Sequence, residues 1–226
     1  MIGIISDIHG NHVALTTVLA ELDALGVKDI LCLGDIAGYY PQINECCDTL
    51  RERNIFSLAG NHDSYLVAGG GCPRSVSATR CLMYQQAIVT PSNLAWLAKL
   101  PLRDSRYGVE LVHGGWHDPL EEYLKPSQAY FDVLPGQYFA SGHTHVQHLW
   151  TGDGKVYCNP GSVGQPRDGD PRAAYAVWDG QTFSLRRVEY DIGAIQRLTR
   201  DAGFESYFYD NLAVGSRIGG KIDRLD

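Results

Sequence analysis

Several features that would place this chain in another class of protein are absent from its sequence. None of the six cysteines belongs to a Cys-x-x-Cys pair, so neither a thiolate zinc site nor a disulfide framework is indicated. No run of about 18 apolar residues occurs, so no transmembrane helix is predicted. Residues 1–7 lack the basic and apolar regions of a signal peptide. We therefore expect a cytoplasmic protein with free, mostly buried thiols and no membrane contact.

Positive charge is scarce as well. The chain has 19 Lys and Arg against 26 Asp and Glu, which gives a formal net charge of −7. A general nucleic-acid-binding surface needs cationic side chains that displace counterions from phosphates, so no dedicated surface of this kind is expected. A bound metal cation can reverse the field locally, and an anionic substrate is therefore compatible with this balance.

Short apolar runs alternate with amphipathic stretches in the first half of the chain, and strand-like runs dominate the second. Helical periodicity, the N-cap signal before Pro91 and the stop signal at Gly26 predict helices at 13–25, 43–50, 77–88, 92–98 and 192–199. Strands are predicted at 2–6, 30–33, 55–58, 102–105, 109–112, 138–140, 156–158, 174–178 and 183–188. The later strands are predicted to be antiparallel, with a hairpin at Gly180.

This order of elements predicts one fold class and one domain. No Ser/Pro/Gly-rich linker divides the 226 residues, and 44% of them are hydrophobic, so a single core-forming domain over 1–226 is expected. The elements fit an α/β fold, a four-layer α/β/β/α sandwich of two mixed sheets flanked by helices. Residues 190–226 are interpreted as a C-terminal extension of uncertain order, with a helix and then a weakly ordered tail.

Polar loops follow five of the predicted strands. Because ligand sites of open α/β sheets gather beyond the carboxyl ends of strands, these loops are expected to meet. Their carboxylate, imidazole and amide groups, without cysteine, favour Mn, Fe, Zn, Co or Ni as the bound metal. The loops are Asp7-x-His9, Gly34-Asp35, Gly60-Asn61-His62-Asp63, His113-Gly114-Gly115 and Gly142-His143-Thr144-His145.

Two pairs of residues in these loops suggest how a cation is held. Asp7 and His9 are two residues apart, so on an extended segment both side chains point the same way and could grip one ion, and His143 and His145 repeat the spacing. A single Gly-Asp or Gly-Asn-His-Asp usually marks only a turn, because Gly, Asn and Asp favour turn conformations. Five motifs in register favour a metal site, and the ligand candidates outnumber the needs of one ion. Two ions that share Asp35 are therefore predicted.

Taken together, the motifs resemble those of the calcineurin-like metallophosphoesterases over residues 1–165. Three further segments are similar to the small bacterial and archaeal phosphodiesterase branch of that family: residues 7–11, His113-Gly114-Gly115 with Asp118-Pro119, and residues 159–167. Where His-Gly-Ser is usual in the family, this chain has Gly115. We interpret this difference as the loss of a hydroxyl group near the metals.

The resemblance implies a role for each motif residue. One divalent ion would be held by Asp7, His9, Asp35 and His145, and the second by Asp35, Asn61, His113 and His143. The cofactor is then a pair of transition-metal ions, Mn, Fe, Ni, Zn or Co, with Mn favoured. Two such ions about 3.5 to 4 Å apart would present a bridging hydroxide to phosphorus. His62 would protonate the leaving oxygen as general acid, and Asp63 would orient the His62 ring.

The hypothesis that follows is hydrolysis of phosphodiesters in a small phosphorylated substrate. The same centre would also serve a dinucleoside polyphosphate hydrolase or a serine/threonine phosphoprotein phosphatase. A third alternative is a non-catalytic metal-binding scaffold of the same fold, although the complete ligand set and His62 argue against it. An oligomer is compatible with the sequence, which does not decide the oligomeric state.

Other residues near the motifs allow two interpretations. Arg167, on a Pro/Gly-rich loop, is a candidate substrate-binding residue, but an ordinary surface arginine is about as frequent. His12, His117 and His148 are interpreted as surface or structural histidines. Residues 159–164 are expected to form a tight turn under the site, with backbone amides that could face an anion. Two roles are open for the aromatic residues near the motifs: they form an aromatic wall of the site, or they pack in the core. These residues are Tyr39, Tyr40, Trp116, Tyr123 and Tyr130.

Overall fold

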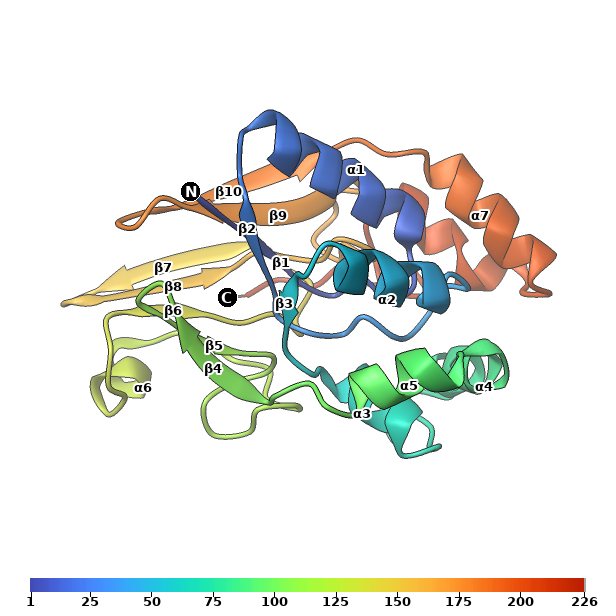
Figure 1. Cartoon of the computed structure of the whole chain (residues 1–226), viewed down its shortest axis with the longest axis horizontal. Coiled ribbons are helices and arrows are strands. Elements are labelled where there is room, and N and C mark those ends of the chain that lie inside the picture. Colours follow the sequence, from blue (N-terminus) through green and yellow to red (C-terminus); the bar gives the residue numbers. More distant parts are fainter. Residues whose placement is uncertain (226) are drawn as a thin grey trace.

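Two five-stranded sheets pack face to face in the structure, a computed structural model that describes residues 1–225 (Figure 1). The strands are β1 (Ile2–Ile5), β2 (Asp29–Cys32), β3 (Phe56–Ser57), β4 (Arg103–Arg106), β5 (Val109–Val112), β6 (Tyr138–Ala140), β7 (His148–Gly152), β8 (Lys155–Asn159), β9 (Ala173–Trp178) and β10 (Phe183–Val188). The first sheet has the order β10-β9-β1-β2-β3, and the second has the order β4-β5-β6-β8-β7.

Both sheets are mixed, as predicted. In the first, β1, β2 and β3 run parallel, whereas β9 is antiparallel to β1 and β10 is antiparallel to β9. In the second, β5, β6 and β8 run parallel, and only the edge strands β4 and β7 are antiparallel. The prediction that the strands of the second half are antiparallel is therefore wrong for the centre of this sheet. Parallel strands need long crossover connections, and these bring the carboxyl ends of β5 and β6 to one edge.

Side-chain caps fix where most helices begin. The helices are α1 (His12–Ala24), α2 (Ile43–Glu52), α3 (Asn61–Val67), α4 (Val76–Ile88), α5 (Pro91–Leu97), α6 (Gln128–Asp132) and α7 (Ile192–Asp201), with the short 3-10 helices η1 (Ser206–Phe208) and η2 (Asp210–Ala213). The Asn11 side chain accepts a hydrogen bond from the Ala14 amide, and Thr90 caps α5 with Pro91 in the first turn. The predicted Thr-Pro helix start is thus confirmed.

Three layers of apolar side chains hold the elements together. Leu15 and Ile43 belong to the cluster between α1, α2 and the first sheet, and Ile4 and Leu111 belong to the cluster between the two sheets. Phe131 of α6 packs in a third cluster on the outer face of the second sheet. The four-layer α/β/β/α sandwich is confirmed, although its outer layer over the second sheet contains only the short helix α6 and loops (Figure 1).

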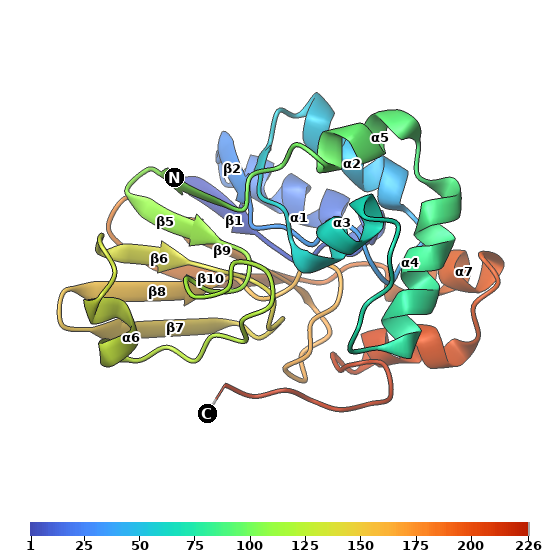
Figure 2. The same ribbon diagram turned by 90° about the horizontal axis from the view of Figure 1, so that it is seen from below.

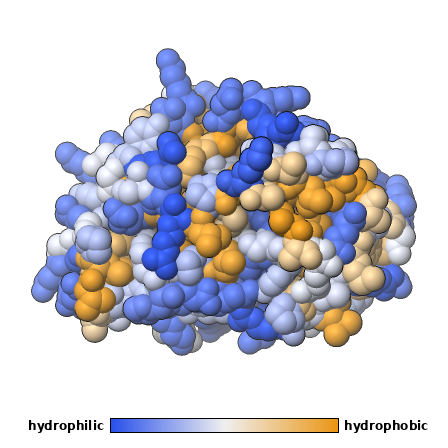
Figure 3. All heavy atoms as spheres, turned by 60° about the horizontal axis from the view of Figure 1, so that its bottom comes forward, coloured by the Kyte–Doolittle hydropathy of each residue, from blue (hydrophilic) through white to orange (hydrophobic). Residues whose placement is uncertain are grey.

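The surface mixes polar and apolar residues. In Figure 3 hydrophobic residues lie between hydrophilic ones and gather toward the right of the face that is drawn. Val76 and Met83 of α4 are among the large hydrophobic side chains that are exposed. Within residues 1–225, no helix has both the length and the apolar character needed to span a bilayer.

The chain beyond α7 turns back across the molecule toward the second sheet (Figure 2). Phe204 and Phe208 are buried in a cluster with Cys81 of α4. Further along, the Gly169 amide donates to the Gly215 carbonyl oxygen at 2.9 Å. Where the sequence predicted only a weakly ordered tail, the structure therefore has two 3-10 helices and a segment fastened to the 167–169 loop.

Candidate metal centre

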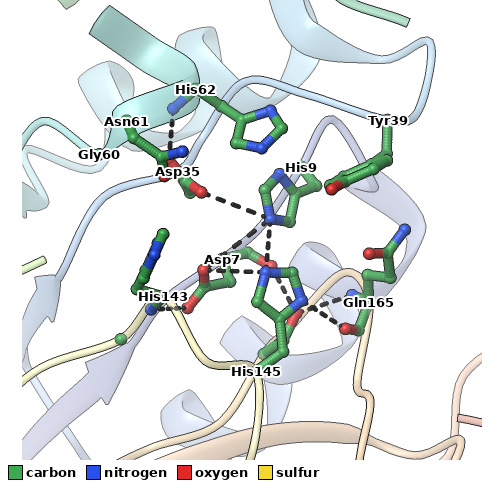
Figure 4. Close-up of polar contacts among 12 residues, drawn as sticks. Asp7, His9, Asp35, Tyr39, Gly60, Asn61, His62, His143, His145 and Gln165 are labelled. Carbon is green, nitrogen blue, oxygen red and sulfur yellow. Dashed lines mark hydrogen bonds and ion pairs between the residues drawn. The ribbon is translucent and has the colours of Figure 1, made fainter. Parts of the chain in front are cut away.

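The five polar motifs converge on one place, as predicted. Asp7 and His9 follow β1, Asp35 follows β2, and Asn61 begins α3 directly after β3 in the first sheet. The other two motifs follow β5 and β6 in the second sheet. Figure 4 shows side chains from four of the motifs pointing toward one another: Asp7, His9, Asp35, Asn61, His143 and His145. The centre thus lies where the carboxyl ends of parallel strands from both sheets meet.

Two histidines of the centre face each other through nitrogens that both carry lone pairs. The His9 Nδ1–H donates to the Ala37 carbonyl oxygen at 2.7 Å, and the His145 Nδ1–H donates to the Gln165 carbonyl oxygen at 2.6 Å. Because a neutral imidazole has one N–H, both Nε2 atoms are then acceptors. These atoms lie only 3.0 Å apart. A cation between them would turn this repulsive contact into coordination, and the carbonyl contacts would orient both ligands.

Asp7 adds an oxygen without a partner to the same group. Its Oδ2 accepts a hydrogen bond from the His143 amide at 3.0 Å. Its Oδ1 is buried, has no hydrogen-bond partner among the described residues and lies 3.2 Å from His145 Nε2 and 3.8 Å from His9 Nε2. Burying a carboxylate oxygen without a partner is costly, and a bound cation would remove that cost. The ligand atoms of Asp7, His9, Asp35 and His145 all lie within 4.8 Å of one another.

The Asp35 carboxylate lies between two groups of ligand atoms. Its Oδ1 is held by the His62 amide at 2.8 Å. Its Oδ2 lies 3.6 Å from His9 Nε2 on one side and 3.4 Å from His113 Nε2 on the other. Asp35, His113 and His143 also form the second cluster of potential ligands. The position of Asp35 fits the bridging role that was predicted for it.

The second group also brings imidazole and carboxylate atoms together, and it adds an amide oxygen. The His113 Nδ1–H donates to the Leu33 carbonyl oxygen at 2.9 Å, which points Nε2 toward the centre. Asn61 Oδ1 lies 3.2 Å from that Nε2 atom. The buried Nε2 of His143 has no partner within residues 1–225. Imidazole, carboxylate and amide ligands of this kind suit divalent transition metals.

Burial and neighbouring charges shift the pKa values of these side chains. Burial, and then the adjacent His145, lower the pKa of His9 well below its usual value, so His9 is neutral and can act as a ligand. Burial opposes protonation of His113 as well, but the Asp35 carboxylate raises the pKa of His113 to about 9. Against its own burial, His113 and His62 hold the pKa of Asp35 well below its usual range. Asp35 is therefore ionised.

The backbone at the paired motifs differs from the extended geometry that was predicted. Asp7 and His9 both have φ of 54°, and His143 and His145 have φ of 66° and 60°, all in the left-handed region. The prediction of extended segments is therefore wrong at both pairs, although Asp7 and His9 do lie in one cluster of potential ligands. His143 and His145 in fact belong to different ligand groups, as the family resemblance implied.

His62 lies beside the ligands without joining either group. Its ring centroid lies 4.9 Å from that of His9 and 5.0 Å from that of Tyr39, and its Nδ1 has no hydrogen-bond partner within residues 1–225. Burial lowers its pKa. A ring so close to the centre, with an uncommitted nitrogen, could exchange a proton with a bound molecule.

Within residues 1–225, no hydrogen bond is found between Asp63 and the His62 ring, which Asp63 was predicted to orient. Asp63 Oδ1 accepts from the Ala37 amide at 2.8 Å, and Oδ2 accepts from the Gly60 amide at 2.9 Å. These contacts arise because Asn61 begins α3, so that Asp63 in its first turn reaches back to the N-cap as in a capping box. Asp63 therefore fastens the start of α3 to the loop after β2 and does not orient the His62 ring.

A cavity of about 250 Å³ opens over the two ligand groups. Arg167 lines it and is only 5% exposed, so the alternative of an ordinary surface arginine is wrong. Its guanidinium donates to Gln165 Oε1 and Tyr39 Oη and makes no salt bridge within residues 1–225. The lining residues are Asp35, Tyr39, Asn61, His62, Cys72, Arg74, Ser75, Ser77, Glu121, Tyr123, His143, His145, Gln165, Arg167, Tyr207, Arg217 and Ile218.

The turn at 159–164 lies under the site, as predicted, but its amides do not face an anion. The Val163 amide donates to the Ser6 carbonyl oxygen and the Gly164 amide to that of Asp7, both at 3.0 Å. The Ser162 hydroxyl also donates to the Asp7 carbonyl oxygen, at 2.7 Å. These bonds hold the loop after β1 in place, so the turn positions the ligands.

Gly115 does not affect the cavity in the way that the sequence suggested. A Cβ atom placed on Gly115 would lie 2.1 Å from Glu122 Oε2. That oxygen accepts hydrogen bonds from the His117 and Asp118 amides and from the Tyr130 hydroxyl. Glu122 thus fills the space of a side chain at this position, and Gly115 is not among the lining residues.

Some residues of the site could not be singled out from the sequence. Of the aromatic candidates only Tyr39 and Tyr123 line the cavity, together with Arg74 and Arg217. No motif marks these four, and only the tertiary fold brings them together. His12, by contrast, contacts Thr49 Oγ1 at 2.8 Å, and His117 and His148 are also absent from the cavity wall, which agrees with their structural interpretation.

The fold and the site define a class, α/β sandwiches with a buried His/Asp cluster where the edges of two sheets meet. The family model of the calcineurin-like phosphoesterase superfamily domain matches residues 1–182, and the chain belongs to this superfamily. The crystal structure of a metallophosphoesterase from Sphaerobacter thermophilus is 35% identical with a TM-score of 0.84, over 95% of this chain and 98% of that one.

Two archaeal proteins are also similar. An uncharacterised protein of Methanocaldococcus jannaschii is 35% identical over 216 residues, which are 85% of this chain and 88% of that protein. The crystal structure of a hypothetical protein from Pyrococcus horikoshii has a TM-score of 0.83 at 20% identity, over 95% of this chain and 99% of that one, and shows a shared fold. The resemblance to metallophosphoesterases is thus confirmed.

Proposed function

We propose that this protein is a metal-dependent hydrolase of small phosphodiesters that works with two divalent ions. The observation that carries the proposal is the arrangement of lone pairs: His9 and His145 face each other with acceptor nitrogens 3.0 Å apart, beside the unpartnered Asp7 Oδ1. The shared Asp35 joins this group to a second one. When bound, the two ions would activate a water molecule and offset the charge of the phosphoryl oxygens. The donor set suits Mn, Fe, Ni, Zn or Co, and Mn is the first metal to test.

The remaining side chains of the cavity have roles that follow from their contacts. His62 holds Asp35 through its backbone amide and keeps its ring free beside the centre, so we assign it the transfer of a proton to the leaving oxygen. Arg167 is buried and has no carboxylate partner within residues 1–225, and its planar guanidinium can bind two phosphoryl oxygens. Tyr39 and Gln165 fix the direction of that guanidinium.

The size of the cavity favours a small molecule over a phosphoprotein. Its volume of about 250 Å³ is just below the roughly 300–1,000 Å³ that is usual for small-molecule sites. Tyr207, Arg217 and Ile218 of the C-terminal segment wall it in, which narrows access for a folded partner. A dinucleoside polyphosphate is the second candidate substrate, because three arginines line the cavity. The complete ligand set argues against a scaffold without catalysis.

Two conservative substitutions test the proposal with bis(p-nitrophenyl) phosphate and Mn²⁺. Asp35→Asn should abolish binding of both ions and lower kcat/KM at least about a hundredfold, because the shared anionic ligand is lost. His62→Gln should keep the metal, as measured by elemental analysis, and lower kcat by about a hundredfold or more, because the proton donor is lost. His12→Gln is the control, since His12 lies outside the cavity. Wild-type turnover in both variants would refute the mechanism.

A further inference from the structure

A second cationic cluster lies in the same cavity, one aromatic ring away from the metal ligands. The Tyr123 ring centroid lies 4.3 Å from that of His143. The guanidinium carbons of Arg74 and Arg217 lie 5.6 and 5.8 Å from the Tyr123 ring centroid. All three residues line the cavity, and none belongs to a ligand group of the metal centre. We call Arg74, Tyr123 and Arg217 the outer cluster.

Each arginine of the outer cluster is held by one acid and retains unused donors. Arg74 pairs with Glu121, and Arg217 pairs through Nε with Asp223. Within residues 1–225, no hydrogen bond is found from the two Nη groups of Arg217. The two arginine side chains are 50% and 36% exposed. The acids therefore orient both arginine side chains before a ligand binds, and the remaining N–H groups are open to a molecule in the cavity.

Arg217 comes from a part of the chain that the superfamily domain does not include. The family model ends at residue 182, whereas the segment around Arg217 is fastened back onto the site. The Asp223 amide donates to the Arg167 carbonyl oxygen at 2.7 Å, and the Arg217 amide donates to the Lys221 carbonyl oxygen at 2.8 Å. Asp223 thus links the outer cluster to the loop that carries Arg167. The C-terminal segment adds a cation to the superfamily site and fixes its position.

The charge of the cavity wall is unlike that of the whole protein. The chain has a net charge of −7, yet three arginines line this one cavity. The carboxylates in the wall are Asp35, which lies between the ligand groups, and Glu121, which is paired with Arg74. Arg167 lies next to the centre and can bind the scissile phosphate. The arginines of the outer cluster are therefore not needed for that phosphate. Arginine forks match phosphate oxygens in geometry and charge.

We propose that the outer cluster is a subsite for a second phosphate group, so that the preferred substrate is a small phosphodiester that carries another phosphate. This inference rests on the proposed hydrolase and adds the substrate class. The Tyr123 ring is already contacted by two guanidinium groups and by His143, so the cluster recognises charge in preference to a stacked base. Arg217 and Arg74 are then specificity-determining residues.

A matched pair of chromogenic substrates tests the subsite. Thymidine 5′-(p-nitrophenyl phosphate) and its 3′-phosphorylated derivative release the same p-nitrophenol when water replaces the aryl oxygen on phosphorus, and they differ only in the second phosphate. With the Mn-loaded full chain, kcat/KM should be roughly tenfold higher for the 3′-phosphorylated substrate. In Arg217→Gln and in Arg74→Gln this ratio should fall toward one. A wild-type ratio of one or less, or an unchanged ratio in both variants, would overturn the subsite.

Arg80→Gln is the matched control. Arg80 also pairs with an acid, Glu205, and lies over the ring of Phe208, but it does not line the cavity. Its substitution should leave the substrate ratio at the wild-type value, and a fall equal to that of Arg217→Gln would show a general charge effect and refute the subsite.

A binding measurement tests the subsite even if neither substrate is hydrolysed. The lack of hydrolysis would itself count against the proposed function. Calorimetric titration of the Mn-loaded protein should then show roughly tenfold tighter binding of thymidine 3′,5′-bisphosphate than of thymidine 5′-phosphate. This preference should be absent in Arg217→Gln. Equal affinities in the wild-type protein would reject the subsite independently of catalysis.

Discussion

Backbone strain at single residues is concentrated at the metal centre. Within residues 1–225, eight residues other than glycine have positive φ, and six of them form or line the centre. Each such conformation costs free energy, which the surrounding structure must offset. The surroundings are also closely packed, since a Cβ atom on Gly142 would lie 2.0 Å from Ser6 Oγ and only glycine fits there. The six residues are Asp7, His9, Asp35, Tyr39, His143 and His145.

Gly115→Ser should destabilise the protein without altering the cavity wall. The new Cβ would meet Glu122 Oε2, and moving this carboxylate would break its bonds to two amides and the Tyr130 hydroxyl. Overpacking of this kind typically costs about 1–3 kcal/mol in the free energy of unfolding. Urea unfolding measures the change, with Gly70→Ser, where the added atom meets open space, as the control. Equal midpoints for the two variants would mean that Glu122 moves aside without cost.

At the level of helices and strands, the sequence predicted the elements that have a regular apolar pattern. It missed the elements that are marked only by local capping or turn signals. The parallel strands β1 and β2 were foreseen because each is a short continuous apolar run, and helices α1, α2 and α4 because their buried residues recur at helical spacing. The motif at 60–63 was taken for a loop, although Asp63 three residues after Gly60 is a capping signal for α3. The strand β7 was missed, although Asp153-Gly154 is a strong signal of a two-residue hairpin loop.

Gly154→Ala should weaken the β7–β8 hairpin. Gly154 has φ of 66°, which alanine adopts only with strain, although no atom lies within 4 Å of an added Cβ. We expect a loss of about 1 kcal/mol in the free energy of unfolding, seen as a lower urea midpoint. Gly70→Ala is the control, because Gly70 also faces open space but has no positive φ. A loss of stability as large in the control would show that the positive φ of Gly154 does not set the cost.

At the scale of the molecule, the sequence located the candidate metal ligands but not the cavity around them. Histidines and carboxylates after strands are recognisable because the α/β topology places those positions together. The outer wall comes from Arg74, Tyr123 and the C-terminal segment, which have no strand before them and no shared spacing. Only packing brings these parts together: Phe204 and Phe208 are buried beside Cys81, and Gly215 is bonded to Gly169.

Removal of metal should lower the stability of the whole protein. The ligands come from both sheets, with Asp7 and Asp35 after strands of the first and His113 and His143 after strands of the second. Ions that bind the folded chain alone stabilise it by about 2.7 kcal/mol at a hundredfold excess over Kd, or a rise in Tm of roughly 5–10 °C for a chain of this size. Scanning calorimetry with EDTA and then with added Mn²⁺ should show this shift and its return. Asp35→Asn should show almost none, because it lacks the carboxylate that both ligand groups share. An equal EDTA-sensitive shift in wild type and Asp35→Asn would place the stabilising metal elsewhere and separate it from the centre between the sheets.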